Sequence, residues 1–247
     1  MRKLSIVFIA TFIALQITFL CLILWGPEQY VNIFEFVSVV NAFLFSLLFI
    51  CKSKSVVLTE IALLFTMLAD LFLEIIKPMN QLVAMILFSV VQLAYFARLF
   101  MEIQSKKWKI INIVARIITI IIAELVAYLV VKEKLDLLSI VAMFYISNLL
   151  LNIMIAFAEF KKSPFLAIGL LLFLGCDIIV GLQVSIGTYF YVSTDSILYK
   201  IAFCPVNITW ICYLPSQTLL TLSILNYNKN TFIKFNKRQK DKFKQVA

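Results

Sequence analysis

The chain has 247 residues and a formal net charge of +9, and 63% of its residues are hydrophobic whereas only 14% are charged. A soluble domain is typically about half apolar and about a quarter charged. Because the mean hydropathy here is +1.03, a soluble globular protein is excluded. The sequence contains no histidine, which excludes histidine-ligated metal or haem and histidine-based catalytic triads.

Apolar segments follow one another along the chain, and each is long enough to cross a ~30 Å hydrocarbon core as a helix. They lie near residues 4–25, 31–51, 56–76, 81–101, 110–131, 137–158, 165–190 and 207–226. Membrane strands would instead show runs of about ten residues with alternating polarity. The sequence therefore predicts an all-α, polytopic membrane helix bundle of eight transmembrane helices. The seventh segment is long enough to end in an irregular turn around "GTYF".

The composition also predicts the domain organisation. Five glycines and five prolines leave no room for a flexible linker or a second soluble domain. We predict a single transmembrane domain over residues 1–226 and a basic cytoplasmic tail over residues 227–247. The first segment follows Met-Arg-Lys but offers no small-residue cleavage site, so we interpret it as a retained span and not as a signal peptide.

The distribution of positive charge predicts the orientation. If both termini are cytoplasmic, sixteen lysines and arginines lie on the cytoplasmic side and four lie on the other side. The positive-inside rule favours this multi-pass arrangement in the cell membrane. We expect the cations of the tail either to attract anionic lipid headgroups, by roughly 1 kcal/mol for each cation, or to act only as a topology signal.

The cysteines do not indicate a metal site. Five are present without metal-type spacing, and most lie within predicted spans, where they are interpreted as small buried apolar residues. The sequence also lacks a Gly-rich phosphate loop. We therefore expect no metal, no cofactor and no nucleic-acid partner.

Two apolar runs, "IALLFTMLADLFLEI" and "IGLLLFLGCDIIVGL", each carry one aspartate, Asp70 and Asp177. The two are 107 residues apart, and the same offset relates Asn41 to Asn148. A period that covers four spans predicts two halves with the same orientation, as in parallel repeats. We therefore predict a possible four-plus-four helix repeat over residues 1–107 and 108–226.

Helix geometry places the polar side chains of the spans at similar depths. With a rise of about 1.5 Å per residue, carboxyl groups lie about 20 Å and amide groups about 15 Å above the cytoplasmic edge. The carboxyl groups belong to Asp70, Glu124 and Asp177, and the amide groups to Asn41, Gln92, Asn148 and Gln217. We interpret this slab, which contains no lysine or arginine, as the lining of one central cavity.

The cost of burying charge separates functional from structural interpretations. A carboxylate within the membrane costs at least about 2–3 kcal/mol, which favours a functional role for Asp70 and Asp177. The amides are equally well explained as hydrogen bonds that hold helices together. Charged residues near span ends are interpreted as snorkelling to the interface. These are Glu35, Glu60, Glu74, Glu159 and Arg98, and Arg116 is given the same interpretation.

Two buried carboxyl groups in one apolar site suggest acid–base chemistry. They do not both ionise readily, so we expect one to hold a proton while the other remains an anion. This division suits a general acid and a general base in a reaction that passes through an oxocarbenium ion. It suits proton-coupled transport equally well.

The motifs "ALLFTMLADLFLEI", "AMILFSVVQLAYFARLF", "AIGLLLFLGCDIIVGL" and "WICYLPSQTLLTLSI" resemble those of the YhhN-type membrane family, over about residues 37–226. The resemblance implies eight spans and the metal-free hydrolysis of the vinyl-ether bond of a lysoplasmalogen, the activity of the family's lysoplasmalogenases. It places Asp70 and Asp177 on the two catalytic aspartates. The sequence departs from the family pattern with Ala69 in place of glycine, with Gln92 in place of histidine, and in lacking the lysine-proline of the second span.

From the resemblance we expect a membrane lipid or lysophospholipid substrate that enters sideways from the bilayer. One aspartic acid would protonate the vinyl-ether carbon remote from oxygen, and the other aspartate would activate a water. Candidates for binding the substrate or orienting the water are Asn41, Gln92, Tyr95, Glu124, Asn148 and Gln217. A proton-coupled carrier of small molecules or lipids, and a non-catalytic membrane protein of the same fold, remain the alternatives.

Overall fold

The computed structural model describes residues 3–48 and 53–225, and the regular structure of these ranges is helical apart from one isolated bridge between Ile186 and Phe190. The longer helices are α1 (Lys3–Trp25), α2 (Val31–Leu47), α3 (Lys54–Asp70), α4 (Gln81–Glu102), α5 (Lys106–Val131), α6 (Leu137–Ala158), α7 (Pro164–Ser185) and α9 (Ile208–Leu222). The shorter ones are η1 (Glu28–Tyr30), the π-helical turn η2 (Leu71–Ile75), η3 (Lys132–Lys134) and α8 (Ile197–Ala202). The predicted all-α fold is confirmed, whereas the predicted tail lies outside the described residues.

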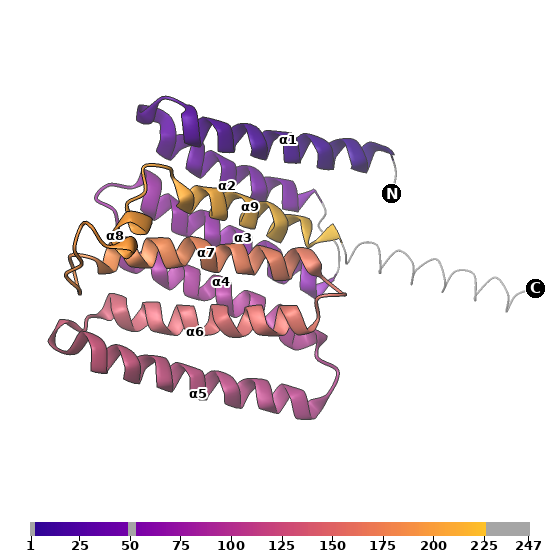
Figure 1. Cartoon of the computed structure of the whole chain (residues 1–247). Coiled ribbons are helices and arrows are strands. Elements are labelled where there is room, and N and C mark those ends of the chain that lie inside the picture. Colours follow the sequence, from indigo (N-terminus) through magenta and orange to yellow (C-terminus); the bar gives the residue numbers. More distant parts are fainter. Residues whose placement is uncertain (1–2, 49–52, 226–247) are drawn as a thin grey trace, which may run out of the picture.

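Seven helical segments of the described chain are long and apolar enough to cross a membrane, so the protein is a polytopic membrane helix bundle. They are formed by α1, η1 with α2, α3 with η2, α4, α5 with η3, α6 and α7. With 15 residues, α9 is shorter, and the predicted count of eight spans is not confirmed. It nevertheless runs lengthwise through the bundle between α7 and α2 (Figure 1).

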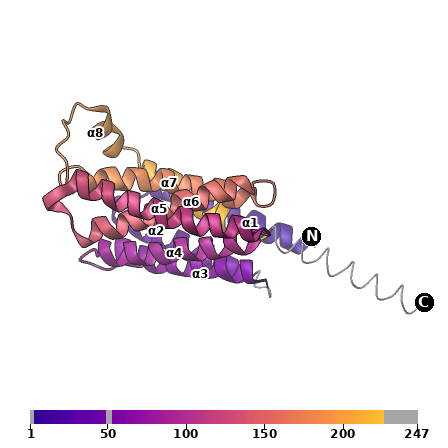
Figure 2. The same ribbon diagram turned by 90° about the horizontal axis from the view of Figure 1, so that it is seen from below.

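The long helices lie side by side, from α1 at one edge of the bundle to α5 at the other (Figure 1). Within it, α4 packs between α3 and α6, while α7 packs chiefly against α9. Helix α8 stands off the side of the bundle next to α7, close to one end (Figure 2), and we call this end the α8 end. We call the opposite end, where α4 connects to α5 and α6 to α7, the lysine-rich end. It carries Lys106, Lys107, Lys109, Lys161 and Lys162.

Capping side chains and one glycine fix several helix ends. At the start of α6, Asp136 Oδ1 accepts a hydrogen bond from the Ser139 backbone N–H (2.8 Å), and the Ser139 hydroxyl accepts one from the Asp136 N–H (3.1 Å). Helix α7 ends at Ser185, and Gly187 adopts a φ of 87° in the turn that follows. The irregular turn predicted around "GTYF" is therefore confirmed.

The contact between α7 and α9 depends on small residues. A Cβ atom at Gly169 would lie 2.9 Å from Leu220 Cγ, so only glycine allows the two helices to approach this closely. The Ser216 hydroxyl then donates a hydrogen bond to the Gly169 carbonyl at 2.8 Å. Small residues of this kind are typical of helix contacts in membranes. This contact holds α9, with its tyrosine, against the helix that carries Asp177.

Candidate functional site

Asp70 is the last residue of α3, and only 3% of its surface is exposed. The Tyr213 hydroxyl of α9 donates a hydrogen bond to Asp70 Oδ2 at 2.7 Å. Past Asp70 the helix widens into the π-helical turn η2. Such turns are frequent at functional sites, and this one lies directly after the predicted catalytic residue.

Asp177 lies on α7, two turns before the end of that helix, and is half-buried. The Tyr145 hydroxyl of α6 donates a hydrogen bond to Asp177 Oδ2 at 2.5 Å. This length is typical of a hydroxyl bonded to a carboxylate. Each aspartate is therefore held by one tyrosine that comes from a neighbouring helix.

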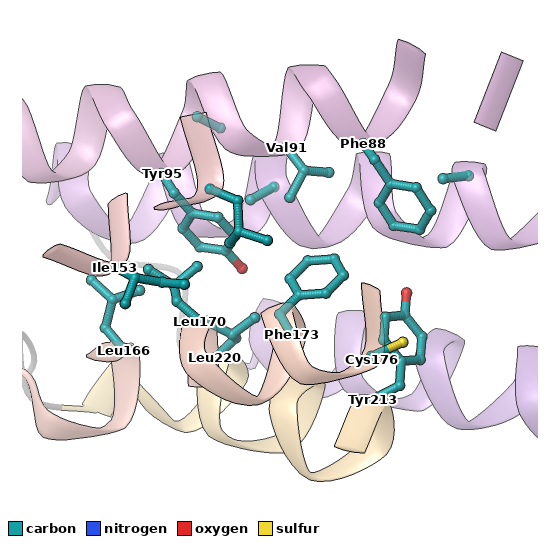
Figure 3. Packing of buried hydrophobic residues seen from close by; sticks show 14 of the residues in the cluster. Phe88, Val91, Tyr95, Ile153, Leu166, Leu170, Phe173, Cys176, Tyr213 and Leu220 are labelled. Carbon is teal, nitrogen blue, oxygen red and sulfur yellow. The ribbon is translucent and has the colours of Figure 1, made fainter. Parts of the chain in front are cut away.

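A wall of aromatic rings joins the two aspartate–tyrosine pairs. The ring of Phe88 lies 6.2 Å from that of Tyr145 and 5.8 Å from that of Phe173, measured between centroids. The ring of Phe173 lies 5.5 Å from that of Tyr213. Figure 3 shows Phe88 and Phe173 facing each other across the interior, with Tyr213 beside them. We call these four residues the aromatic wall.

Electrostatic interactions link the two carboxyl groups. Asp177 is close enough to Asp70 to interact with it electrostatically, and the buried Cys176 thiol interacts with both. Neither of the two ion pairs found among the described residues includes an aspartate. Within the described part of the chain, each carboxyl thus meets a tyrosine hydroxyl instead of a cation.

Two glutamates extend the acidic site toward the α8 end. Glu35 of α2 and Glu74 of η2 lie side by side, and both interact electrostatically with Asp70. Asn207, which caps α9, donates a hydrogen bond from Nδ2 to Glu35 Oε1 at 3.2 Å. Glu74 is half-buried, but Glu35 is only 4% exposed. The prediction that Glu35 snorkels to the interface is therefore wrong, because α2, η2 and the start of α9 enclose it.

The tyrosines that hold the aspartates are site residues that the sequence analysis missed. Tyr145 lies three residues before Asn148, and Tyr213 lies four residues before Gln217. Residues at these spacings share a helix face, so both tyrosines lie on the same face as an amide of the predicted slab. This helical spacing is the signal by which they could have been found.

From the Asp70–Tyr213 pair toward the lysine-rich end, several buried polar groups have no hydrogen-bond partner among the described residues. Thr66 lies one turn from Asp70 on α3, and Gln217 lies one turn from Tyr213 on α9. The unpartnered atoms are the Thr66 and Tyr95 hydroxyls, Asn41 Nδ2, Gln92 Nε2 and both amide atoms of Gln217. We call these five residues the polar layer. Because buried polar groups without partners are rare and costly, the layer is suited to bind water or the polar part of a ligand.

Asn148, in contrast, belongs to a network around Arg116 of α5. The guanidinium donates from Nη1 to Asn148 Oδ1 (2.8 Å), from Nη2 to Asn152 Oδ1 (2.6 Å) and from Nε to Asn112 Oδ1 (3.0 Å). Asn152 Nδ2 donates in turn to Gln92 Oε1 at 3.0 Å. Arg116 is only 5% exposed, so the prediction that it snorkels is wrong. In this structure Asn148 ties α6 to α5, which is the structural alternative that the sequence left open. The prediction that the slab contains no lysine or arginine is also wrong, because the Arg116 guanidinium extends to Asn148.

Arg98 of α4 is fully buried as well, and the prediction that it snorkels is also wrong. Its Nη1 donates to the Thr59 hydroxyl (2.6 Å) and to the Ser223 hydroxyl (2.8 Å), and its Nη2 donates to the Ser163 hydroxyl (3.5 Å). These partners come from α3, from the residue after α9 and from the residue before α7. Arg98 therefore fastens four chain segments together near the lysine-rich end.

The remaining predicted residues lie away from the aspartates or in simpler surroundings. Glu124 is half-buried on α5, which packs against α6 at the edge of the bundle, so the structure does not bring it to the two aspartates (Figure 1). Glu60 is buried, contrary to the prediction, whereas Glu159 pairs with Lys162 at the lysine-rich end. Among the described residues, no group of three or more cysteine, aspartate or glutamate side chains is placed to hold a metal ion.

Residues 30–224 match the model of the YhhN family. This range contains both aspartate–tyrosine pairs, the aromatic wall and the polar layer. Comparisons with curated proteins and with solved structures found no match. The family that the sequence motifs resemble is therefore confirmed.

Proposed function

We propose that this chain, which belongs to the YhhN family, is an integral membrane hydrolase that cleaves the vinyl-ether bond of lysoplasmalogen-type lipids by acid–base catalysis. Membership of the family supports a lysoplasmalogenase-like membrane protein at the level of the family. The finer assignment, to this bond and to particular residues, rests on the geometry of the site.

The observation that carries the proposal is the pairing of two carboxyl groups with two tyrosines on one aromatic wall. Hydrolysis of a vinyl ether needs one group that protonates carbon and a second that takes a proton from water. Asp70 and Asp177 supply these two groups, and no ion pair of the described residues occupies either of them. The faces of the aromatic rings would stabilise the positive charge that develops on the substrate.

In the proposed reaction, Asp70 transfers its carboxyl proton to the vinyl-ether carbon remote from oxygen, and an oxocarbenium ion forms. Water attacks the cationic carbon while Asp177 takes a proton from that water, and the product of this step is a hemiacetal. The bond from the hemiacetal carbon to the glycerol oxygen then breaks. Asp177 returns its proton to the glycerol oxygen, and the hemiacetal hydroxyl returns a proton to Asp70. The products are a fatty aldehyde and a glycerophospho-alcohol, and both carboxyl groups regain their initial states.

The burial of the two carboxyl groups supports a division of roles. Asp177 is half-buried, whereas Asp70 is enclosed, and Asp177 is the proposed base. Asp70 is almost completely enclosed and lies against the neighbouring acidic side chain of Glu74, which favours a proton-carrying acid. The hydroxyls of Tyr213 and Tyr145 would fix the orientation of the two carboxyl groups during the proton transfers.

The polar layer supports a binding site next to this reaction centre. Thr66 and Gln217 lie one turn from Asp70 and Tyr213, and their unpartnered groups have both donors and acceptors to offer. They are suited to hold the attacking water or a hydroxyl of the glycerol. Asn41, Gln92 and Tyr95 are proposed to complete this layer, whereas Asn148 is engaged by Arg116.

A proton-coupled carrier is the second candidate, and one feature favours it. The π-helical turn η2 follows Asp70 directly, and Pro215 lies within α9 two residues after Tyr213. Irregular helix geometry of this kind beside a buried polar site is a feature shared with secondary transporters, whose binding sites are formed by discontinuous helices. The acidic residues Glu35 and Glu74 would then lead protons toward the α8 end.

An assay of aldehyde release tests the proposal. Purified full-length protein is incubated with a lysoplasmenyl lipid, and the fatty aldehyde is measured with time. We expect release by the unchanged protein, and loss of release in Asp70→Asn and in Asp177→Asn. Asp195→Asn, which alters an exposed aspartate in the connection before α8, is the matched control and should retain activity.

Two outcomes would contradict the hydrolase. One is that purified protein releases no aldehyde but takes up a substrate into liposomes when a proton gradient is applied, which supports the carrier. The other is that aldehyde release persists unchanged in both aspartate variants, in which case the reaction occurs elsewhere or comes from a contaminant.

A further inference from the structure

A groove lies between α4 and α5, with a volume of about 500 Å³. Its lining is almost entirely apolar and consists of Phe96, Ala97, Phe100, Met101, Ile113 and Ile117, together with Arg116. Helix α5 lies at the edge of the bundle (Figure 1), where it packs against α6 and exposes many isoleucines to its surroundings. The groove is therefore reachable from the lipid phase.

Two cations accompany this apolar groove. The guanidinium carbon of Arg116 lies 3.9 Å from the centroid of the Phe96 ring, and Lys109 Nζ lies 5.1 Å from the centroid of the Phe100 ring. Lys106, Lys109, Ile113 and Arg116 recur at intervals of three or four residues, so they follow one stripe of α5. The stripe runs from the lysine-rich end, which faces the headgroups, into the hydrocarbon region.

No ion pair among the described residues balances the positive charge of this stripe. The three partners of the Arg116 guanidinium are neutral asparagine oxygens. Within the described residues, the ion pairs involve neither Arg116 nor Lys109. A cation in a medium of low dielectric constant attracts anions over a longer range than it does in water. The groove thus has an apolar lining and lies beside positive charges that form no ion pair among the described residues.

We infer that this groove binds an anionic phospholipid of the surrounding membrane, with one acyl chain between α4 and α5 and the headgroup phosphate at Lys109 and Lys106. The volume is within the range of sites for single small ligands, roughly 300–1,000 Å³. Lys106 and Lys109 lie in the first turn of α5, at the end of its candidate membrane span, and Ile113, Arg116 and Ile117 of the groove follow along the helix. A zwitterionic lipid would fill the same walls but would not neutralise the stripe.

Quenching of tryptophan fluorescence by lipids with brominated acyl chains tests this inference. Trp108 is 62% exposed and precedes Lys109, whereas Trp210 is buried, so Trp25→Phe leaves Trp108 as the exposed reporter among the described residues. Trp25→Phe protein is placed in phosphatidylcholine vesicles that contain a minor fraction of brominated phosphatidylglycerol or of brominated phosphatidylcholine. We expect stronger quenching by the anionic lipid, with an apparent preference of about fivefold for each lysine engaged.

Three substitutions distinguish binding in the groove from a general attraction of anionic lipids to the lysines. Ala97→Phe fills the groove without changing charge, and Ile121→Phe adds similar bulk on an exposed part of α5. We expect the preference for the anionic lipid to be lost in Ala97→Phe, reduced in Lys109→Ala and retained in Ile121→Phe. The inference is overturned if the two brominated lipids quench equally, or if Ala97→Phe keeps the full preference. Since this readout needs no turnover, its result is independent of whether the protein hydrolyses vinyl ethers.

Discussion

Buried charges have different surroundings toward the two ends of the bundle. Toward the α8 end, Asp70 and Asp177 each receive one side-chain hydrogen bond, from a tyrosine hydroxyl. Toward the lysine-rich end, Arg98 and Arg116 each donate to three or more oxygen atoms. The arginines do not neutralise the aspartates, because no ion pair among the described residues joins an arginine to an aspartate.

The difference separates charges that build the fold from charges that are suited to react. A guanidinium carries five donors, and the bundle provides fixed acceptors for most of them, so the arginines hold helices in place. A carboxylate has about four acceptor sites, and here most of these lie unused beside an aromatic wall and a polar layer. Burying an ionisable group with few hydrogen-bond partners costs free energy of folding. This cost is consistent with the proposed functional role of the two aspartates.

The largest expected effect concerns the aspartates. In Asp70→Asn and Asp177→Asn, the amide oxygen still accepts the tyrosine hydrogen bond, but the side chain no longer transfers a proton. We expect the rate of aldehyde release to fall by about 10²–10⁴-fold, while the melting temperature in detergent stays the same or rises. A large fall in melting temperature in either variant would mean that this aspartate stabilises the fold, as the arginines do.

Arg98 should show the reverse behaviour. Arg98→Met removes the hydrogen bonds to Thr59, Ser163 and Ser223 and leaves these hydroxyls buried without their donor. We expect the free energy of unfolding to fall by about 3 kcal/mol or more, measured by unfolding the purified protein in mixed micelles with increasing denaturing detergent. Lys107→Met, at an exposed position of α5, is the control and should leave stability nearly unchanged.

The tyrosines should have effects of intermediate size. Tyr213→Phe and Tyr145→Phe each remove one hydrogen bond to an aspartate but keep the ring in the aromatic wall. The expected loss of stability is about 1 kcal/mol, and we expect the turnover number to fall by about tenfold, corresponding to about 1.4 kcal/mol. If turnover is unchanged in both variants, the tyrosines do not orient the carboxyl groups.

The smallest expected effect lies outside the spans, at the start of α6. Burial slightly opposes ionisation of Asp136, but hydrogen bonds from Ser139 and Tyr189 outweigh it, so the pKa of Asp136 lies below its usual range. A lowered folded-state pKa stabilises the protein above the unfolded pKa, near 4, and this contribution is lost as the pH falls through the folded pKa. Asp136→Ala should cost about 0.5–1 kcal/mol at neutral pH.

The pH dependence provides the check on that last prediction. The difference in melting temperature between the unchanged protein and Asp136→Ala should shrink as the pH is lowered below about 4. A difference that stays constant over this range would mean that the cap acts through the neutral form of the side chain. Asp136 differs in this respect from Asp70 and Asp177, each of which accepts a single side-chain hydrogen bond from a tyrosine inside the bundle.

Much of the site could be found without the structure, and the reason is periodicity. The helical rise alone predicts one depth for Gln92 and Gln217, and both belong to the polar layer with at least one unpartnered amide atom. Glu124 has a similar calculated depth but lies on α5, away from the aspartates. Depth along a helix is a local property, whereas the direction in which a side chain points depends on where the helix is packed.

The sequence by itself determined that this is a polytopic helical membrane protein of the YhhN family with an aspartate in each of two apolar spans, because hydropathy and motifs are properties of short segments. Only the tertiary structure decided the partners of these charges. Tyr145 reaches Asp177 across 32 residues of chain, and Tyr213 reaches Asp70 across 143. The two arginines turned inward because hydroxyls and amides from other helices meet them there, and such contacts exist only once the helices have packed.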